Sequence, residues 1–301
     1  MIRSLCCSSL LLLPIGADAE TIYVRPAADT ALLEAFPTNN FGGQRWFNAG
    51  TTQTYLKNHG LIRFDIAGAL PANARILSAT LTVEVVGQPI DGYAIENFRL
   101  HRVLKDWAEG SNTGLPPHLG SPADTNECNW THRFAFTSET WATPGGSNGV
   151  DYASDYSVDT YVYDTFASPY TFGPAPAMTA DLQQWLERPE TNFGWMLIAE
   201  HEEINFTARR FASREDPILG PVLAVNFVVP PALTIKHDDA NVALSFIGRG
   251  DQGYIVEYCE TLSCNPWLLL TNLPPEDTTG PRVVSEPTDG AKRFYRVKLS
   301  E

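Results

Sequence analysis

The sequence predicts an all-β protein composed of two β-sandwiches. Short alternating or apolar segments recur along the chain, glycine and proline clusters separate them, and helical periodicity is scarce. The dipeptide Pro230-Pro231 interrupts this pattern, which then restarts. We therefore expect a larger sandwich over residues 20–229 and a smaller one over residues 230–301.

The N-terminus has the features of an export signal. Arg3 precedes the apolar run 10–13, and the Ala-Asp-Ala tripeptide at 17–19 fits a cleavage site. The apolar run is too short to span a bilayer. We expect residues 1–19 to be a signal peptide, cleaved after Ala19, and the product to be secreted and extracellular, with the periplasm and the cell surface as alternative locations.

The chain is strongly acidic, because 21 basic and 35 acidic residues give a net charge of −14. A surface of this charge repels nucleic acid and anionic membranes. No later apolar segment of spanning length follows. We expect neither nucleic-acid binding nor membrane insertion, whereas divalent cations such as calcium would be attracted.

The first domain contains segments that combine β-branched and aromatic residues with alternation, as strands of a jelly-roll-like sandwich do. These segments are residues 21–26, 52–66, 74–87, 98–104, 194–200, 205–213 and 222–229. In the second segment, Ile62, Phe64 and Ile66 share one face, which we expect to point into the sandwich. Arg63 and Asp65 share the other face, and we expect them to be structural.

One segment, APAMTADLQQWLERPETN, predicts a helix. Thr179 is the expected N-cap and Pro189 the expected end. Leu182, Trp185 and Leu186 recur at helical spacing, so they should form its buried face.

The second domain repeats the strand pattern on a smaller scale. Its expected strands are residues 232–237, 241–247, 253–259, 267–273, 281–287 and 292–299. This size and rhythm is typical of an immunoglobulin-like or fibronectin type III-like sandwich. We expect it to act as a spacer or as a docking module for surface or matrix proteins.

Three cysteines follow the expected signal peptide. Cys259 and Cys264 flank four residues at an expected hairpin, so a local disulfide is favoured in an oxidising compartment. Two free thiols are the alternative. Cys128 would be left unpaired, and we expect it to be buried.

The segment 111–178 is rich in Asn, Asp, Tyr and Trp. Its candidates for a carbohydrate-binding platform are Trp130, Trp141, Tyr152 and Tyr156, because the negative face of an aromatic ring attracts the weakly positive C–H edges of a sugar. The alternative is that these aromatic side chains fold back onto the sandwich.

Charged residues supply two further candidates. Asp151, Asp155 and Asp159 recur every four residues and offer hard oxygens for calcium, although their spacing lacks the usual calcium-loop pattern and a solvated loop is favoured. Arg210 and Arg214 share one face of the strand expected in ARRFASRE, residues 208–215, and can bind carboxylates of an anionic glycan. We favour the alternative, in which both arginines pair with carboxylates of the domain.

Catalytic motifs are missing from the sequence. It contains no H-E-x-x-H, no G-x-S-x-G, no phosphate-binding loop and no dinucleotide fingerprint. The sequence therefore favours a protein that is not an enzyme.

Seven short motifs occur in an order that is typical of one family. They are Ala28-Asp29-Thr30 with Asn40-Phe41-Gly42, Leu61–Asp65 with Leu70-Pro71, Ala79-Thr80-Leu81, Trp107–Gly110, Trp141–Gly146, Asp181 and Trp185 with Asn192-Phe193-Gly194, and Phe211–Glu215. On these residues, the first domain resembles the DNRLRE-type β-sandwiches, a carbohydrate-binding module family of bacterial and archaeal secreted proteins. The resemblance spans the whole domain but is weakest over residues 111–178.

The resemblance implies a secreted, non-catalytic protein that binds polysaccharide through its first domain. Trp107 and Trp185 match its motifs, and we expect both to be core residues. In the "NNFGG" turn, Asn40 should supply side-chain turn hydrogen bonds. The other function classes that stay open are a structural or adhesive protein of the cell surface or matrix, and a polysaccharide lyase or hydrolase with an unrecognised site.

Overall fold

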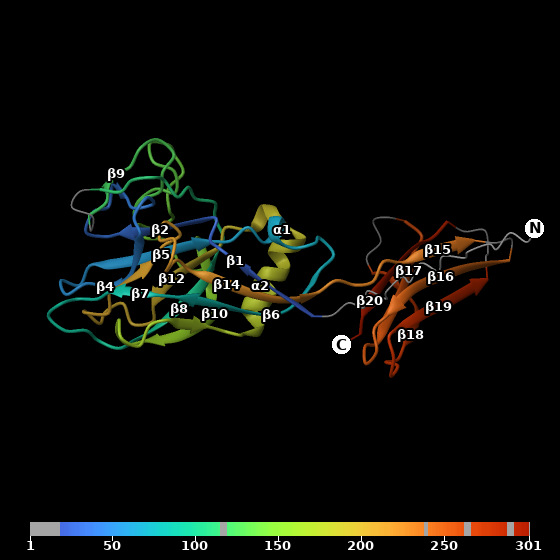
Figure 1. Ribbon diagram of the computed structural model, residues 1–301. Helices are drawn as coiled ribbons and strands as arrows, with labels where there is room; N and C mark the ends of the chain where they lie inside the picture. The colour runs from blue at the N-terminus through green and yellow to red at the C-terminus, as the bar shows by residue number, and fades with distance from the viewer. Residues whose placement is uncertain (1–18, 115–118, 238–239, 262–265, 288–291, 301) are drawn as a thin grey trace, which may run out of the picture. The chain divides into compact units, whose positions relative to one another are not determined.

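The computed structural model describes residues 19–114, 119–237, 240–261, 266–287 and 292–300. The expected signal peptide, apart from Ala19, lies outside these residues. The chain divides into two compact units, one formed by Glu20–Phe227 and one that begins at Val228, just before Pro230-Pro231. Both units are built from β-sheets (Figure 1), so the predicted all-β fold class is confirmed.

The first unit contains a four-stranded and an eight-stranded sheet. The four-stranded sheet has the order β1 (Glu20–Val24), β14 (Val222–Val228), β6 (Arg75–Val83), β11 (Tyr170–Phe172). The eight-stranded sheet has the order β10 (Tyr152–Val162), β8 (Glu96–Val103), β12 (Trp195–Ala199), β5 (Lys57–Arg63), β4 (Trp46–Thr51), β13 (Arg209–Ala212), β7 (Val85–Gly87), with β2 (Ala28–Leu33) also paired to β5. A two-stranded ladder joins β3 (Asn39–Asn40) to β9 (Ser121–Pro122).

Both faces of the eight-stranded sheet are covered. Leu61 and Ile62 are adjacent in β5, so their side chains point to opposite faces, and both are buried. On the face that carries Leu61, the long connection between β8 and β10 contributes Trp107, Trp130 and Trp141 to a hydrophobic cluster that also contains Leu61. This connection therefore folds back onto the sheet.

The strand that carries Arg63 ends earlier than predicted. β5 stops at Arg63, and Asp65 is the N-cap of α1 (Ile66–Ala69), where its side chain accepts the N–H of Gly68 at 2.9 Å. The guanidinium of Arg63 lies 3.2 Å from Asp106 and over the ring of Trp107. Both residues have the structural roles that were expected, although Asp65 caps a helix and does not belong to the strand.

The predicted helix is α2 (Pro176–Glu187), and it packs against β6 and β10. Its buried face contains Leu182, Trp185 and Leu186, as predicted, and it ends before the 3-10 helix η1 (Pro189–Thr191). The prediction that Thr179 is the N-cap is wrong. The helix begins earlier because Pro176 occupies its first turn, where a missing N–H carries no cost, and Thr179 donates to the carbonyl of Ala175.

The second unit has two three-stranded sheets. Their orders are β15 (Thr234–His237), β16 (Asn241–Gly248), β19 (Gly280–Pro287) and β18 (Leu268–Leu273), β17 (Tyr254–Cys259), β20 (Phe294–Leu299). Leu244, Phe246, Tyr254 and Val256 are central to the unit's own core. The size and strand number agree with a small sandwich.

The cysteines differ in their environments. Cys259 is disulfide-bonded. Its expected partner Cys264 lies outside the described residues, so the pairing stays a prediction. Cys128 is free and buried, as expected, and burial raises the pKa of its thiol far above the ordinary value. None of the helices in the described residues is long and apolar enough to cross a membrane.

Candidate functional site

Trp130 and Trp141, the strongest aromatic candidates from the sequence, are buried. They are 7% and 3% exposed and pack in the cluster on the Leu61 face of the sheet. The indole N–H of Trp141 donates to the carbonyl of Asn129 at 2.9 Å, and the ring of His59 lies 5.1 Å from that of Trp130. Neither indole presents a ring face to solvent, so the platform interpretation is wrong for these two residues.

Tyr152 and Tyr156 lie on β10, and only part of each ring could contact a sugar. Tyr152 is half-buried against the same cluster, whereas Tyr156 is 41% exposed. The guanidinium of Arg99 already covers the ring of Tyr156 at 4.7 Å, and His101 contacts both tyrosine rings. The two tyrosines are neighbours, but their ring faces are largely occupied.

The predicted calcium ligands do not converge. Asp155 and Asp159 lie four residues apart on an extended strand, which separates them by about 13 Å. The carboxylate of Asp151 is buried and accepts the backbone N–H groups of Ala142 and Ser147. Asp159 accepts an amide hydrogen from Asn97 at 2.7 Å. The calcium prediction for Asp151, Asp155 and Asp159 is therefore wrong.

In the described part of the chain, two other groups of three metal-ligating side chains have ligand atoms within 4.8 Å of one another: Glu96 with Glu200 and His201, and Asp29 with Glu109 and Glu215. In the first group, Arg99 pairs with Glu200, and His201 lies 3.1 Å from Glu96. These protein partners account for the geometry of the group without a metal ion.

Arg214 neutralises part of the second group. It binds both carboxylate oxygens of Glu109, at 2.6 and 2.8 Å, and lies 3.1 Å from Glu215. Its backbone N–H donates to Asp29. The motifs that contain Asp29, Glu109 and Arg214 thus meet in one structural cluster. The prediction that Arg214 pairs with carboxylates is confirmed.

A groove of about 300 Å³ lies beside β4, β13 and β7. Its polar lining consists of Asn48, Thr52, Gln53, Asn58, Gln88, Arg209 and Arg210. Its other lining residues are Leu33, Ala35, Phe36, Gly87, Pro89, Leu119 and Ala208. Side-chain amides, two arginines and small apolar surfaces therefore meet in one concave site.

Arg210 is the most distinctive residue of this groove. It is exposed and lies over the ring of Trp46 at 5.2 Å. In the β13 ladders it stands opposite Asn48 on β4 and Gly87 on β7. A Cβ at Gly87 would lie 3.0 Å from the Cδ of Arg210, so the glycine leaves room for this side chain.

The charge of Arg210 has no counterpart among the residues that the structure describes. No hydrogen bond or ion pair joins it to any of them, so the expectation that it pairs with a carboxylate is wrong. Its neighbour Arg209, in contrast, is buried and donates to backbone carbonyls, among them those of Ala94 and Tyr163. One arginine is structural, and the other is presented to the groove.

Two further polar atoms near Arg210 are unused. The Oδ1 atom of Asn48 and the indole N–H of Trp46 are buried without a hydrogen-bond partner among the described residues. Such atoms are uncommon in folded proteins. Of the two residues, Asn48 lines the groove, so the groove contains one side-chain acceptor without a partner.

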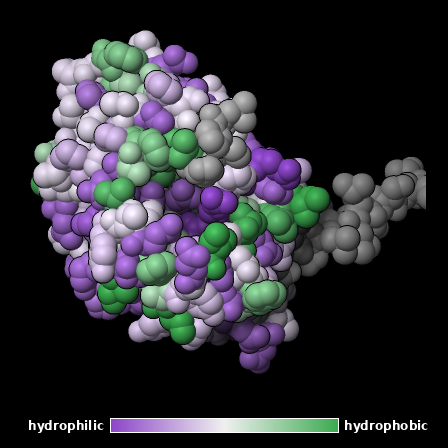
Figure 2. Space-filling view, turned by 90° about the vertical axis from the view of Figure 1, so that its left-hand side faces the viewer, coloured by the Kyte–Doolittle hydropathy of each residue, from purple (hydrophilic) through white to green (hydrophobic). Residues whose placement is uncertain are grey.

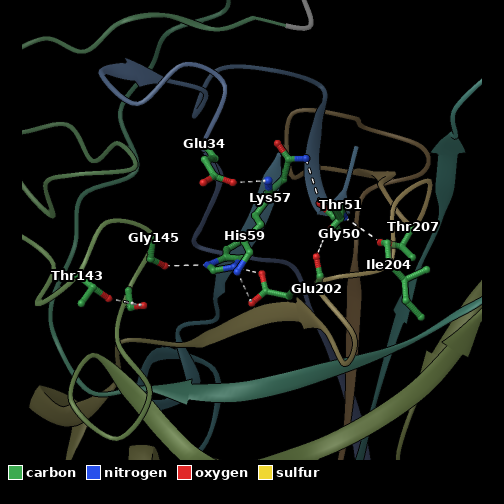
Figure 3. A network of polar contacts seen from close by, with 12 residues as sticks. Glu34, Gly50, Thr51, Lys57, His59, Thr143, Gly145, Glu202, Ile204 and Thr207 are labelled. Carbon is green, nitrogen blue, oxygen red and sulfur yellow. Dashed lines mark hydrogen bonds and ion pairs between the residues drawn. The ribbon is translucent and has the colours of Figure 1, made fainter. Parts of the chain in front are cut away.

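A polar network supports the groove walls (Figure 3). Glu34, beside the groove residues Leu33 and Ala35, accepts the backbone N–H of Lys57 at 2.7 Å. Thr51 precedes the groove residue Thr52, and its hydroxyl donates to the carbonyl of Glu202 at 2.8 Å. These contacts fix the wall segments to β5 and to the β12–β13 connection.

The network continues along β4 and β5. The backbone N–H of Thr51 donates to the hydroxyl of Thr207, and the amide of Asn58 donates to the carbonyl of Gly50. His59 joins the carboxylate of Glu202 to the carbonyl of Gly145. Sequence reasoning missed this network because most of its partners are backbone atoms.

The surface at one end of the first unit is mainly hydrophilic. Figure 2 shows one end of the unit, where hydrophilic residues predominate and hydrophobic ones form small, separate groups.

The sequence matches no known family model, and no curated protein matches it significantly. The resemblance to the DNRLRE-type modules and to fibronectin-like domains therefore remains an interpretation of short motifs.

Proposed function

We propose that this protein is a secreted, non-catalytic polysaccharide-binding protein and that its first unit binds the glycan in the groove beside β4, β13 and β7. The observation that carries the proposal is Arg210, which lies over Trp46 without an ion-pair partner in an amide-lined groove. Sugar hydroxyls both donate and accept hydrogen bonds, as side-chain amides do. Phe36 and Pro89 offer apolar surface for the C–H faces of the ring.

The charge of Arg210 favours glycans that carry an anionic group. A guanidinium binds a carboxylate or a sulfate through two parallel hydrogen bonds, and this recognition is stronger than that of a neutral hydroxyl. Because the protein as a whole has a charge of −14, an acidic glycan needs a local cation of this kind.

The lining also supports a non-catalytic role. The described residues that form the groove include no carboxylate, histidine, cysteine or tyrosine. Glycosidic bond cleavage requires a positioned general acid or base, commonly a pair of carboxylates. The groove residues can therefore hold a glycan without supplying such a group.

Affinity electrophoresis of the chain without residues 1–19 tests this proposal. The gels contain neutral, uronate-containing or sulfated polysaccharides, each with and without calcium. We expect at least one acidic glycan to retard the protein, and Arg210→Gln to weaken its binding by about 10- to 100-fold, the range for a hydrogen bond to a charged group. Calcium should not change the retardation, because Asp151, Asp155 and Asp159 do not converge.

Arg188→Gln is the matched control, because Arg188 is an exposed arginine at the end of α2 and does not line the groove. It should bind as the unmodified protein does. Failure of every glycan to retard the protein, together with self-association, would support a structural or adhesive protein instead. Release of reducing ends or unsaturated uronates would overturn the non-catalytic assignment.

A further inference from the structure

His59 is buried between two hydrogen-bond acceptors. Only 4% of its surface is exposed. Its Nδ1 lies 2.7 Å from the carbonyl oxygen of Gly145, and its Nε2 lies 2.6 Å from a carboxylate oxygen of Glu202 (Figure 3). A neutral imidazole has one N–H, so one ring nitrogen would direct a lone pair at an acceptor. The geometry requires a second proton on His59 or a proton on Glu202.

The surroundings favour an ionised Glu202. Burial raises the pKa of Glu202, but the hydrogen bond and charge of His59 and the nearby Lys57 outweigh burial and hold the pKa below its ordinary value. The Nζ of Lys57 lies 3.5 Å from the carboxylate. The two acceptors around the ring and the ammonium of Lys57 beside the carboxylate together favour the second proton on the imidazole, whose ring lies beside the electron-rich ring of Trp130.

Two further titratable side chains, His101 and Tyr152, lie beside this site, and the carboxylate of Asp151 lies near Tyr152. Burial lowers the pKa of His101 on β8, and the charges of Arg99 and His59 lower it further against the effect of its bond to Ala153. Burial, followed by the charge of Glu202, raises the pKa of Tyr152 on β10. Both shifts favour the neutral form of the side chain.

We propose that His59, protonated on both ring nitrogens, is a proton-dependent latch that holds the walls of the groove, so that polysaccharide binding weakens as the pH rises. When the imidazole loses a proton, one of its two hydrogen bonds becomes a contact between lone pairs. Either the turn at Gly145 or the segment around Glu202 must then separate from β5. The second half of this proposal, the effect on binding, rests on the proposed function.

The contacts of Glu202 connect the latch to the groove. Its backbone carbonyl accepts the hydroxyl of Thr51, which directly precedes the groove residues Thr52 and Gln53. Asn58, the residue before His59 in β5, also lines the groove. A shift of Glu202 would therefore move the groove residues Thr52 and Gln53. A shift of β5 would move the groove residue Asn58.

The protonation state of His59 can be measured without any glycan. Long-range ¹H–¹⁵N NMR of the imidazoles, recorded from pH 5 to pH 8, should show both nitrogens of His59 protonated at the acidic end. Loss of the second proton should accompany a lower melting temperature, because the folded state then loses a hydrogen bond. A neutral His59 throughout this range would overturn the latch.

The variant Glu202→Gln should hold a neutral His59, whereas the unmodified protein holds a doubly protonated one. The amide of a glutamine can donate to the Nε2 atom of a neutral imidazole, so no second proton is needed. We expect His59 of this variant to be neutral and protonated on Nδ1 where the unmodified protein holds two protons. Identical His59 signals in the two proteins would contradict the proposal.

Glycan affinity on the same samples tests the regulatory half. In the unmodified protein it should fall by about tenfold as His59 loses its proton, which corresponds to one charge-assisted hydrogen bond. In Glu202→Gln it should be independent of pH. His201→Gln is the control, because His201 is an exposed histidine next to Glu202 in sequence, and its side chain contacts Glu96 and not Glu202.

The two proposals fail separately. If NMR shows a doubly protonated His59 and no glycan binds at any pH, the latch stands and the proposed function fails. If a glycan binds equally at all pH values while His59 titrates, the proposed function stands and the regulation is wrong.

Discussion

Asp29 carries its carboxylate in one of the least accessible places of the first unit. It is 1% exposed and accepts the backbone N–H of Arg214 at 2.7 Å. Burial raises its pKa well above the ordinary value of 3.8, and the charges of Glu215 and Glu109 add to this shift against the effect of Arg214. The folded state therefore binds a proton at Asp29 more tightly than the unfolded state does.

The sign of this shift predicts the behaviour of Asp29→Asn. Because the folded-state pKa is raised, the wild-type protein loses stability as the pH rises from 3.8 through the raised value. The asparagine keeps an acceptor for Arg214 without a charge. We expect the variant to match the wild type at acidic pH and to exceed it by about 1–3 kcal/mol at neutral pH.

Urea denaturation across a pH series measures this difference. A variant that is less stable than the wild type at neutral pH would show that the carboxylate charge is stabilising, as it would be beside a bound cation.

The burial of the tryptophans could be predicted from the sequence only in part. Trp107 and Trp185 were predicted to be core residues and are buried. Trp130 and Trp141 lie in the polar segment 111–178 and were therefore candidates for a surface platform, yet they are buried as well. Burial of a residue in a long connection depends on where that connection folds, and no local pattern encodes this.

At the scale of elements, Asn40 joins three chain segments. Its side-chain amide donates to the carbonyls of Glu109 and Cys128 at 2.7 and 2.9 Å, and its Oδ1 accepts the N–H of Gly42. The expected turn hydrogen bond is confirmed by the contact with Gly42. The other two bonds hold the long β8–β10 connection to the turn at β3.

Asn40→Ala should therefore lower stability by about 3 kcal/mol, because it leaves buried backbone groups without partners. Asn39→Ala removes a single bond, from the neighbouring amide to the carbonyl of Leu119, and should cost about 1 kcal/mol. Chemical denaturation of both variants measures the comparison. Equal losses would mean that Asn40 does not hold the connection in place.

The strands were predictable where hydrophobicity alternates. β6, β8, β12, β14 and the strands of the second unit overlap segments assigned from the sequence, with ends that differ by at most two residues except at the end of β6, which shares its segment with β7. β4 and β10 were missed because each carries polar residues in its interior, such as Asn48 in β4 and Ser154 to Tyr156 in β10. Their place in the sheet depends on neighbouring strands and not on their own pattern.

At the scale of the whole molecule, the groove could be predicted only in part. Arg210 was a candidate from the sequence because a strand pattern placed it on the same face as Arg214. Trp46, Asn48 and Gly87 become its neighbours only through the register of β13 with β4 and β7. Strand register between distant segments cannot be read from one sequence, so the site needed the structure.

The central claim is that the first unit binds polysaccharide in the groove that contains Arg210. NMR chemical-shift mapping tests it most directly, by titration of the ¹⁵N-labelled chain without residues 1–19 with oligosaccharides of the glycan that gives the strongest retardation. We expect the largest shifts in the side chains of Arg210, Asn48 and Gln53. Largest shifts on the β8–β10 face around Tyr156, or in the second unit, would contradict it.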